Sequence, residues 1–214
     1  MLTTFIFNME ITQDIINSKE NWQGNVLKRF DEKRAEVSWS PFEGNYDKMK
    51  KELILPLSKN KIVLEIGCHL GRWTRELTEA KKVIGVDLYD ESGIYIEREF
   101  PELKDFTFYK TLGNELSIAE DSSIDFIFSI DSLSRASVFT INKYLNEISR
   151  VLKEDGIALL HIPSNSSALS LQLGFTSIET KDIKKTCLEL GFKKIEMSDE
   201  YIYHGVLLKI SKHE

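Results

Sequence analysis

The segment from Lys61 to Leu88 constrains the fold more than any other part of the 214-residue chain. Its first apolar run, Ile62–Ile66, breaks at Gly67, as a buried parallel strand does before a tight turn. Gly71 brackets the other end of the turn, and residues that favour a helix follow it. A second apolar run then ends at Asp87. The segment therefore predicts a strand, turn, helix and second strand within a parallel sheet.

This predicted unit is suited to binding a nucleoside. The backbone N–H groups of the helical turn after Gly71 would point at a ligand above the loop and favour an anionic group. Asp87, at the carboxyl end of the second strand, can accept hydrogen bonds from both hydroxyls of a ribose. The same geometry could hold a dinucleotide, but the pattern from Glu65 is E-x-G-x-x-x-G and not G-x-G-x-x-G. An alternative is that the two glycines only end a strand and cap a helix.

Several motifs resemble those of the class I S-adenosylmethionine-dependent methyltransferases. Glu65 with its glycine turn is similar to the first motif of that family, and Asp87 matches its ribose-binding acid. The stretches LEIGCHLGRWT and SIDFIFSIDSL are similar to a bacterial subgroup with R-W-T and S-F-D-S-L signatures. The pattern R-x-L-K-x-x-G at 150–156 is a further shared feature, and the resemblance covers roughly 39–165. It implies S-adenosylmethionine as the cofactor and methyl transfer as the reaction.

The resemblance also implies a set of cofactor-binding positions. They lie ahead of the first strand, in the glycine turn, after the second strand, in the loop after the third strand and at the end of the fourth: Trp39, Glu65, Gly67, Cys68, His69, Gly71, Arg72, Trp73, Asp87, Leu88, Asn114, Glu115, Leu116, Ser129, Ile130 and Asp131. Trp39 is expected to help close the site, although it could equally staple the N-terminal region to the sheet. Asn114 is expected to bind the adenine amine through its carbonyl oxygen, unless it is an ordinary turn residue.

Two residues at the carboxyl edge of the predicted sheet are candidates for catalysis. Methyl transfer from a sulfonium needs alignment above all, but a hydroxyl acceptor also benefits from a base that removes its proton. Asp131, just past the fourth strand, is the leading candidate, and His161 at the end of the fifth strand is the second. Asp131 could instead cap a helix or bind the cofactor's amino group. His161 could be a hydrogen-bonded histidine without a catalytic role.

Three positions depart from the family pattern. His69 stands where a glycine is common, Leu112 where the adenine loop usually has an acid, and Arg135 where the subgroup has a histidine. Arg135 could bind a carboxylate or phosphate of the acceptor through its planar guanidinium. The preferred prediction is a methyltransferase that acts on a small-molecule or sugar hydroxyl. The alternatives are a methyltransferase-like protein that binds the cofactor without catalysis, and a dinucleotide oxidoreductase.

The remaining pattern predicts an α/β fold with a Rossmann-like, doubly wound sheet of seven strands, mostly parallel with an antiparallel last strand. Further strands are expected at 106–110, 124–130, 157–162, 192–197 and 201–210, with helices at 89–100, 138–152 and 180–190. Residues 1–57 are expected to form an N-terminal helical cap whose last helix, 45–55, stops before Pro56. Residues 58–214 are expected to form the methyltransferase domain, with 163–177 as a candidate lid.

Composition limits the partners. The net charge is −6 and the basic residues form no stripe, which argues against nucleic acid and favours small-molecule substrates or proteins. Cys68 and Cys187 match no metal-binding or disulfide pattern, so we expect no metal site and a reducing, cytoplasmic location. Residues 1–7 are apolar but too short to cross a bilayer, so no membrane anchor is expected. The oligomeric state stays open.

Overall fold

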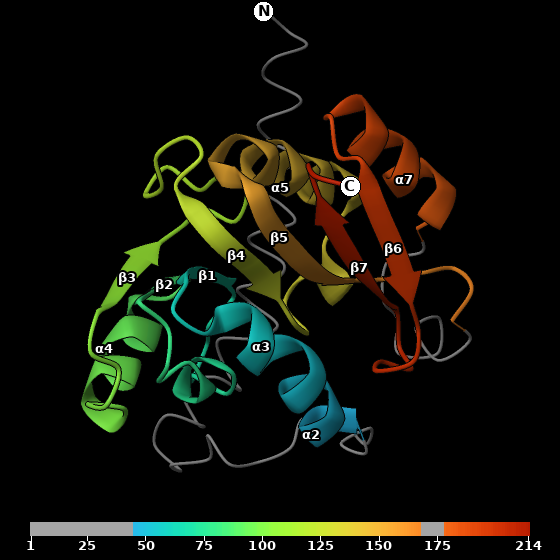
Figure 1. Cartoon of the computed structure of the whole chain (residues 1–214). Coiled ribbons are helices and arrows are strands. Elements are labelled where there is room, and N and C mark those ends of the chain that lie inside the picture. The colour runs from blue at the N-terminus through green and yellow to red at the C-terminus, as the bar shows by residue number, and fades with distance from the viewer. Residues whose placement is uncertain (1–44, 168–177) are drawn as a thin grey trace, which may run out of the picture. The chain divides into compact units, whose positions relative to one another are not determined.

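The computed structural model describes residues 45–167 and 178–214, all within one compact unit, Ser38–Glu214. Seven strands form one sheet in the order β3-β2-β1-β4-β5-β7-β6 (Figure 1). The strands are β1 (Ile62–Ile66), β2 (Lys82–Asp87), β3 (Phe106–Lys110), β4 (Ile124–Ser129), β5 (Leu152–Ile162), β6 (Lys194–Ser198) and β7 (Val206–Ser211). β7 runs antiparallel to both of its neighbours, β5 and β6, and the other strand pairs are parallel. The predicted Rossmann-like α/β sheet with an antiparallel last strand is confirmed.

Helices cover both faces of the sheet. The described helices are α2 (Tyr46–Met49), the π-helix η3 (Lys50–Ile54), α3 (Leu55–Ser58), the 3-10 helices η4 (Thr74–Glu76) and η5 (Leu133–Arg135), α4 (Asp90–Glu99), α5 (Val138–Val151) and α7 (Thr180–Glu189). α5 and α7 lie together on one face, and α3 lies on the other (Figure 1). Among the described residues, no helix combines the length and apolar character needed to cross a membrane.

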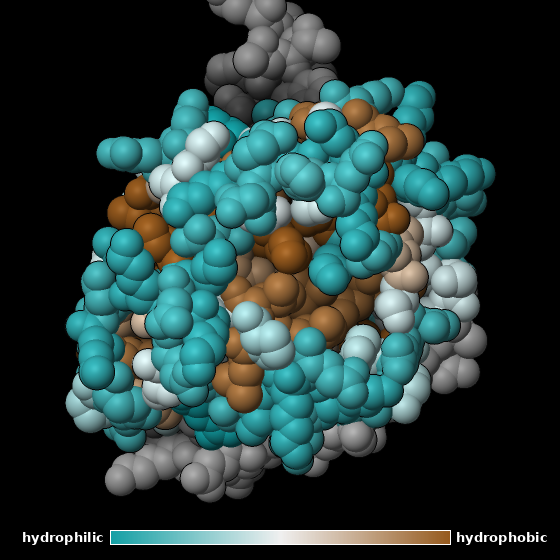
Figure 2. All heavy atoms as spheres, viewed as in Figure 1, coloured by the Kyte–Doolittle hydropathy of each residue, from teal (hydrophilic) through white to brown (hydrophobic). Residues whose placement is uncertain are grey.

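The core consists of two apolar layers, one on each face of the sheet. Side chains alternate between the layers along a strand, so Phe126 and Phe128 of β4 belong to one layer while Ile127 belongs to the other. Burial on both faces explains why the central strands read as nearly continuous apolar runs. Figure 2 shows hydrophobic residues gathered in the middle of the face that carries α3, within a ring of hydrophilic residues. The sheet is thus a rigid platform whose strand ends can position a site.

The helix predicted directly after Gly71 does not form. The chain instead makes turns and then the single 3-10 turn of η4, in which Leu77 N–H donates to Thr74 O at 3.0 Å. Trp73 and Leu77 are buried within this short connection, and the Thr74 hydroxyl bonds to a side chain of β1. These contacts hold the segment in a tighter path than an α-helix allows. The prediction of an anion site at a helix N-terminus was therefore wrong in its geometry.

The helix ahead of β1 continues through Pro56, although the sequence predicted that it would stop before that residue. The π-helical turn of η3, in which Leu55 N–H donates to Lys50 O, widens the helix just before the proline. Pro56 then occupies the start of α3, where a missing N–H costs little. Met49 and Ile54 bury this part of the predicted cap against the sheet. The full cap over 1–57 stays a prediction, because 1–44 lie outside the described residues.

Two strands, β5 and β7, differ most from their predicted limits. β5 begins at Leu152, which pairs with Ile124 before an irregularity in the register, so the strand is longer than predicted. β7 begins only at Val206, where its pairing with the end of β5 starts. The segment 201–205 that precedes it forms a connection and not a strand. This later start places that connection beside the carboxyl end of β5.

Candidate active site

The glycine turn after β1 has the backbone geometry that only glycine adopts easily. Gly67 and Gly71 have φ angles of 80° and 73°, in the left-handed region. A Cβ on Gly67 would lie 1.8 Å from Ser132 Oγ, and this hydroxyl donates to Gly67 O at 3.1 Å. The turn after β1 and the turn after β4 therefore touch. They meet between adjacent strands where the strand order reverses, the usual place for a ligand crevice in such sheets.

Asp87 at the end of β2 is bonded to the backbone on both of its oxygens. Oδ2 accepts from His69 N–H at 2.8 Å, and Oδ1 accepts from Leu88 N–H at 2.7 Å. His69 has a φ of 45°, so this hydrogen bond accompanies an unusual backbone conformation for a residue with a side chain. Burial raises the pKa of Asp87 to about 6, against the backbone hydrogen bonds that lower it. Oδ1 also accepts from Tyr89 N–H at 3.3 Å, so Oδ2 is the oxygen that keeps a further lone pair for a hydroxyl.

Glu65 is buried beneath the same turn. Its Oε2 accepts a hydrogen bond from Thr74 Oγ1 at 2.6 Å, and the residue is 2 % exposed. Burial raises the pKa of Glu65 to about 8, with the Thr74 hydrogen bond acting in the opposite direction. The carboxyl is therefore neutral at pH 7 and ties β1 to η4. Its predicted contact with the cofactor stays a prediction.

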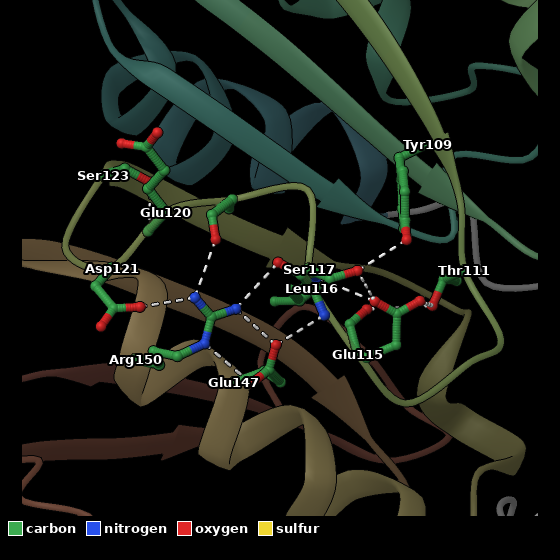
Figure 3. A network of polar contacts seen from close by, with 11 residues as sticks. Tyr109, Thr111, Glu115, Leu116, Ser117, Glu120, Asp121, Ser123, Glu147 and Arg150 are labelled. Carbon is green, nitrogen blue, oxygen red and sulfur yellow. Dashed lines mark hydrogen bonds and ion pairs between the residues drawn. The ribbon is translucent and has the colours of Figure 1, made fainter.

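The loop between β3 and β4, predicted to lie along the adenine, is anchored by Arg150 of α5 (Figure 3). Its guanidinium donates to the carbonyls of Leu116 and Ala119, at 3.2 and 3.0 Å. It also pairs with the carboxylates of Asp121 and Glu147, at 2.8 and 2.7 Å. This explains physically why an arginine stands in the R-x-L-K-x-x-G pattern. Arg150 therefore holds the loop from the side of α5.

The predicted adenine-loop residues differ in their surroundings. Leu116 is fully buried, and its N–H donates to Glu147 at 2.9 Å. The Glu115 carboxylate accepts from Ser117 and from the Thr111 hydroxyl, the latter at 3.2 Å (Figure 3). Asn114 lies between these anchored positions and is half-buried. The predicted contact of Asn114 with the adenine stays a prediction.

Other predicted cofactor positions have structural contacts. Ser129 donates its hydroxyl to Ile66 O at 2.9 Å, which ties the ends of β4 and β1 together, and Ile130 is buried in the core. Trp73 is also a core residue, and the Arg72 guanidinium lies 5.9 Å from its ring centroid. Cys68 is a buried free thiol whose pKa burial raises well above its ordinary value. Trp39 lies outside the described residues.

The two predicted catalytic residues do come together at the carboxyl edge of the sheet. Asp131 Oδ1 lies 3.1 Å from His161 Nδ1. Asp131 has a φ of 64°, a conformation that aspartate tolerates better than most residues and that is frequent at functional sites. On its other oxygen, Oδ2 lies 3.9 Å from Arg72 Nη1, which connects the cluster with the glycine turn.

A third member of this cluster, His204, was missed by the sequence prediction. Its Nε2 lies 2.9 Å from Asp131 Oδ1, and its ring meets the ring of His161 edge to face at a centroid distance of 4.6 Å. His204 comes from the connection before β7, which lies beside the end of β5 because these strands pair antiparallel. That pairing was the available signal: an antiparallel last strand must begin near the residue where its partner ends.

The histidines determine the charge state of Asp131. Burial alone would raise its pKa, but hydrogen bonds from His161 and His204 hold the pKa of this carboxyl well below its usual range. The Asp131 carboxyl is therefore ionised at neutral pH. Such a carboxylate binds hydrogen-bond donors well and is a weak base.

Fold and site together define a Rossmann-like domain with a polar cluster at the carboxyl edge of its sheet. A sequence model of the methyltransferase domain family matches residues 63–156, which span the glycine turn, Asp87 and Asp131. Among curated proteins, a search found no match to the chain.

Solved structures agree with that domain class. A S-adenosylmethionine-dependent methyltransferase from Clostridium acetobutylicum is similar with a TM-score of 0.66 and 17 % identity, over 91 % of this chain and 99 % of that one. A candidate enzyme of the same kind from Listeria monocytogenes has a TM-score of 0.63 and 19 % identity, over 80 % and 97 %. A Haloferax volcanii complex of the Trm112 methyltransferase activator with a candidate methyltransferase gives 0.65 and 15 %, over 91 % and 97 %. At these identities the structures establish the shared fold.

The match over 63–156 and the shared fold support the predicted resemblance to the class I S-adenosylmethionine-dependent methyltransferases, with S-adenosylmethionine as the cofactor of the domain.

Proposed function

We propose that the protein is an S-adenosylmethionine-dependent methyltransferase that acts on a hydroxyl group of a small molecule, for example of a sugar. The observation that carries the proposal is the position of Asp87, which is bonded to the glycine turn at the end of β2 while the turn itself touches the residues after β4. This arrangement places two groups on one edge of the sheet: a carboxylate that can accept hydrogen bonds from the ribose, and a polar cluster that can bind the substrate to be methylated.

In this proposal, the cofactor lies across the ends of β1, β2 and β4. Asp87 accepts the ribose hydroxyls, and the turn from Gly67 to Gly71 takes the neighbouring part of the cofactor against its backbone. Asn114, on the loop that Arg150 anchors, meets the adenine. The methyl group then points toward Asp131, whose carboxylate binds the acceptor hydroxyl.

The chemistry requires little beyond this alignment. The acceptor oxygen attacks the methyl carbon, the bond from that carbon to sulfur breaks, and the sulfur keeps the electron pair. Alignment of the reacting groups supplies several kcal/mol of the rate enhancement, on the order of 7 or more in favourable cases. Asp131 accepts a hydrogen bond from the acceptor hydroxyl while His161 and His204 hold Asp131, and the hydroxyl proton passes to solvent water as the new bond from oxygen to carbon forms.

The choice of a small-molecule acceptor rests on the acidic net charge of −6 and the absence of a basic stripe in the sequence. We also propose a cytoplasmic location, since Cys68 and Cys187 are both free thiols. The Haloferax complex is an example of a structurally similar protein bound to a protein activator. A protein partner of this chain would be compatible with the same cofactor site.

Isothermal titration calorimetry with S-adenosylmethionine and S-adenosylhomocysteine tests the proposal. We expect one site for each ligand, and methyl transfer to a member of a panel of hydroxylated small molecules. Asp131→Asn should retain S-adenosylhomocysteine binding and lose turnover. Failure to bind either ligand would refute the proposal. Tight binding with no turnover on any acceptor would favour the alternative, a cofactor-binding protein without catalysis, to which the non-glycine turn residue His69 points.

A further inference from the structure

The cluster of Asp131, His161 and His204 has the composition of a metal site. Their ligand atoms, one carboxylate oxygen and two imidazole nitrogens, all lie within 4.8 Å of one another. The closest pairs are Asp131 Oδ1 to His204 Nε2 at 2.9 Å and Asp131 Oδ1 to His161 Nδ1 at 3.1 Å. Ligands at about 2.0–2.2 Å from a zinc ion lie about 3 Å or a little more from each other, so small adjustments bring the three atoms around one ion.

The hydrogen bonding within the cluster leaves one contact of His161 unsatisfied in either neutral tautomer. Asp131 N–H points at His161 Nδ1 from 3.2 Å, which calls for an unprotonated nitrogen. Asp131 Oδ1 faces the same nitrogen, which calls for a proton. A cation between Oδ1 and Nδ1 would remove the repulsion between these two lone pairs, and Asp131 N–H would then lose Nδ1 as its acceptor.

The surrounding structure holds the rings in this arrangement. His161 is fully buried and His204 is 8 % exposed, so both rings are fixed by packing. A Cβ at Gly205 would lie 2.6 Å from His161 Nε2, and glycine at this position therefore makes room for the ring. The Asp131 side chain is 36 % exposed, which leaves the cluster open on its carboxylate side. A bound ion would keep coordination positions for a ligand there.

We propose that Asp131, His161 and His204 bind one divalent first-row transition metal ion, which in turn binds the acceptor hydroxyl. Two imidazoles and one carboxylate are the donors that zinc, iron(II), cobalt(II) and manganese(II) sites use, and three protein ligands leave open positions for an exchangeable oxygen. This departs from the sequence prediction, which found no metal pattern because the three ligands are distant in the chain. Arg72, 3.9 Å from the outer oxygen of Asp131, stays paired with that oxygen while Oδ1 binds the ion.

The inference rests on the proposed methyl transfer for its role, although the site itself does not. An ion at this position lowers the pKa of the bound hydroxyl, so that its proton leaves to water and the resulting alkoxide attacks the methyl carbon. The bond between methyl and sulfur breaks toward sulfur as before. The weak basicity of Asp131 is then no obstacle, because the ion and not a side chain activates the hydroxyl.

The test uses full-length protein without a histidine tag, stripped with a chelator and titrated separately with zinc and cobalt(II). We expect one ion per chain by calorimetry, and visible cobalt bands of a site with nitrogen and oxygen ligands. His204→Ala should weaken zinc binding about 100-fold or more. Asp131→Asn, chosen because asparagine also tolerates a positive φ, should weaken it as well. His213→Ala removes an exposed histidine near the chain end and should change nothing.

Binding of S-adenosylhomocysteine to each variant serves as the check of folding and separates the two proposals. A protein that binds S-adenosylhomocysteine but neither metal would overturn the metal site and leave the methyltransferase proposal standing. Metal binding without cofactor binding would do the reverse. Metal binding that survives both His204→Ala and Asp131→Asn, or that is lost equally in His213→Ala, would also overturn the proposed site.

Discussion

The proposed cofactor side and the proposed acceptor side of this site are built in different ways. The cofactor side is one continuous stretch, β1, the glycine turn and β2, whose parts bond to one another through Asp87 and Glu65. The acceptor side joins Asp131, His161 and His204 from three separate strand ends. A local unit can be recognised from residue spacing, whereas a cluster from distant segments requires knowledge of which strands pair. The two sides should therefore respond to different substitutions.

The largest expected effect is on the cofactor side. Asp87→Ala removes the proposed acceptor of the ribose hydroxyls, and should weaken S-adenosylhomocysteine binding by about 30-fold or more, equivalent to about 2 kcal/mol. It also frees His69 N–H, so the glycine turn should loosen. Calorimetry measures the affinity, and Asp90→Ala, an exposed aspartate in the first turn of α4, is the control. Equal affinities of Asp87→Ala and the parent would show that β2 does not carry the ribose site.

The second prediction concerns the stability of the folded protein without a ligand, and how it depends on pH. The raised pKa of Glu65, about 8, means that the folded state keeps a proton that the unfolded state releases above pH 4.5. Stability should therefore fall as pH rises from about 4.5 to about 8. Glu65→Gln removes this dependence and keeps an acceptor for Thr74. Its advantage over the parent should grow to about 2 kcal/mol at pH 8.5, allowing for some relaxation of the buried site.

Urea unfolding at pH 5.5, 7 and 8.5 measures this difference. The matched control is Glu102→Gln, an exposed glutamate, which should show no pH-dependent advantage. A Glu65→Gln variant whose advantage over the parent is the same at all three pH values would contradict a neutral Glu65 beneath the turn.

A smaller effect is expected where the adenine loop joins α5. Arg150→Met keeps much of the side chain's length but removes its hydrogen bonds to two carbonyls and its two ion pairs. We expect a loss of about 1–2 kcal/mol in unfolding free energy, because the guanidinium is partly buried. Arg98→Met, in an exposed pair with Glu99, should cost less than about 0.5 kcal/mol. Equal losses in the two variants would mean that Arg150 does not anchor the loop.

The sequence predicted the sheet and the cofactor unit because both follow from local patterns. Glycine spacing, apolar runs and Asp87 at a strand end were sufficient for β1, β2 and the turn. The helix after Gly71 was mispredicted, because the contact of Thr74 with Glu65 and the burial of Trp73 override helix propensity. Pro56 was misjudged because a π-helical turn cannot be read from composition.

On the acceptor side, Asp131 and His161 could be predicted as strand-end residues, but their contact could not. His204 had no motif at all, and its place depends on the register of β7 against β5. The same holds for Arg150. The sequence showed it within a known pattern, but only the folded structure shows that it bonds to the carbonyls of Leu116 and Ala119. Residues that act through long-range contacts are the ones that sequence reasoning misses.

We have proposed that the cofactor binds across the glycine turn and the end of β2. Amide hydrogen exchange with and without S-adenosylhomocysteine tests this placement, since His69 and Leu88 N–H both bond to Asp87. We predict slower exchange at 67–73 and 87–89 when the ligand is bound, a smaller change at 111–116, and no change over 183–197, which includes most of α7 and β6. Protection confined to other segments, or none at 67–73 and 87–89, would contradict the claim.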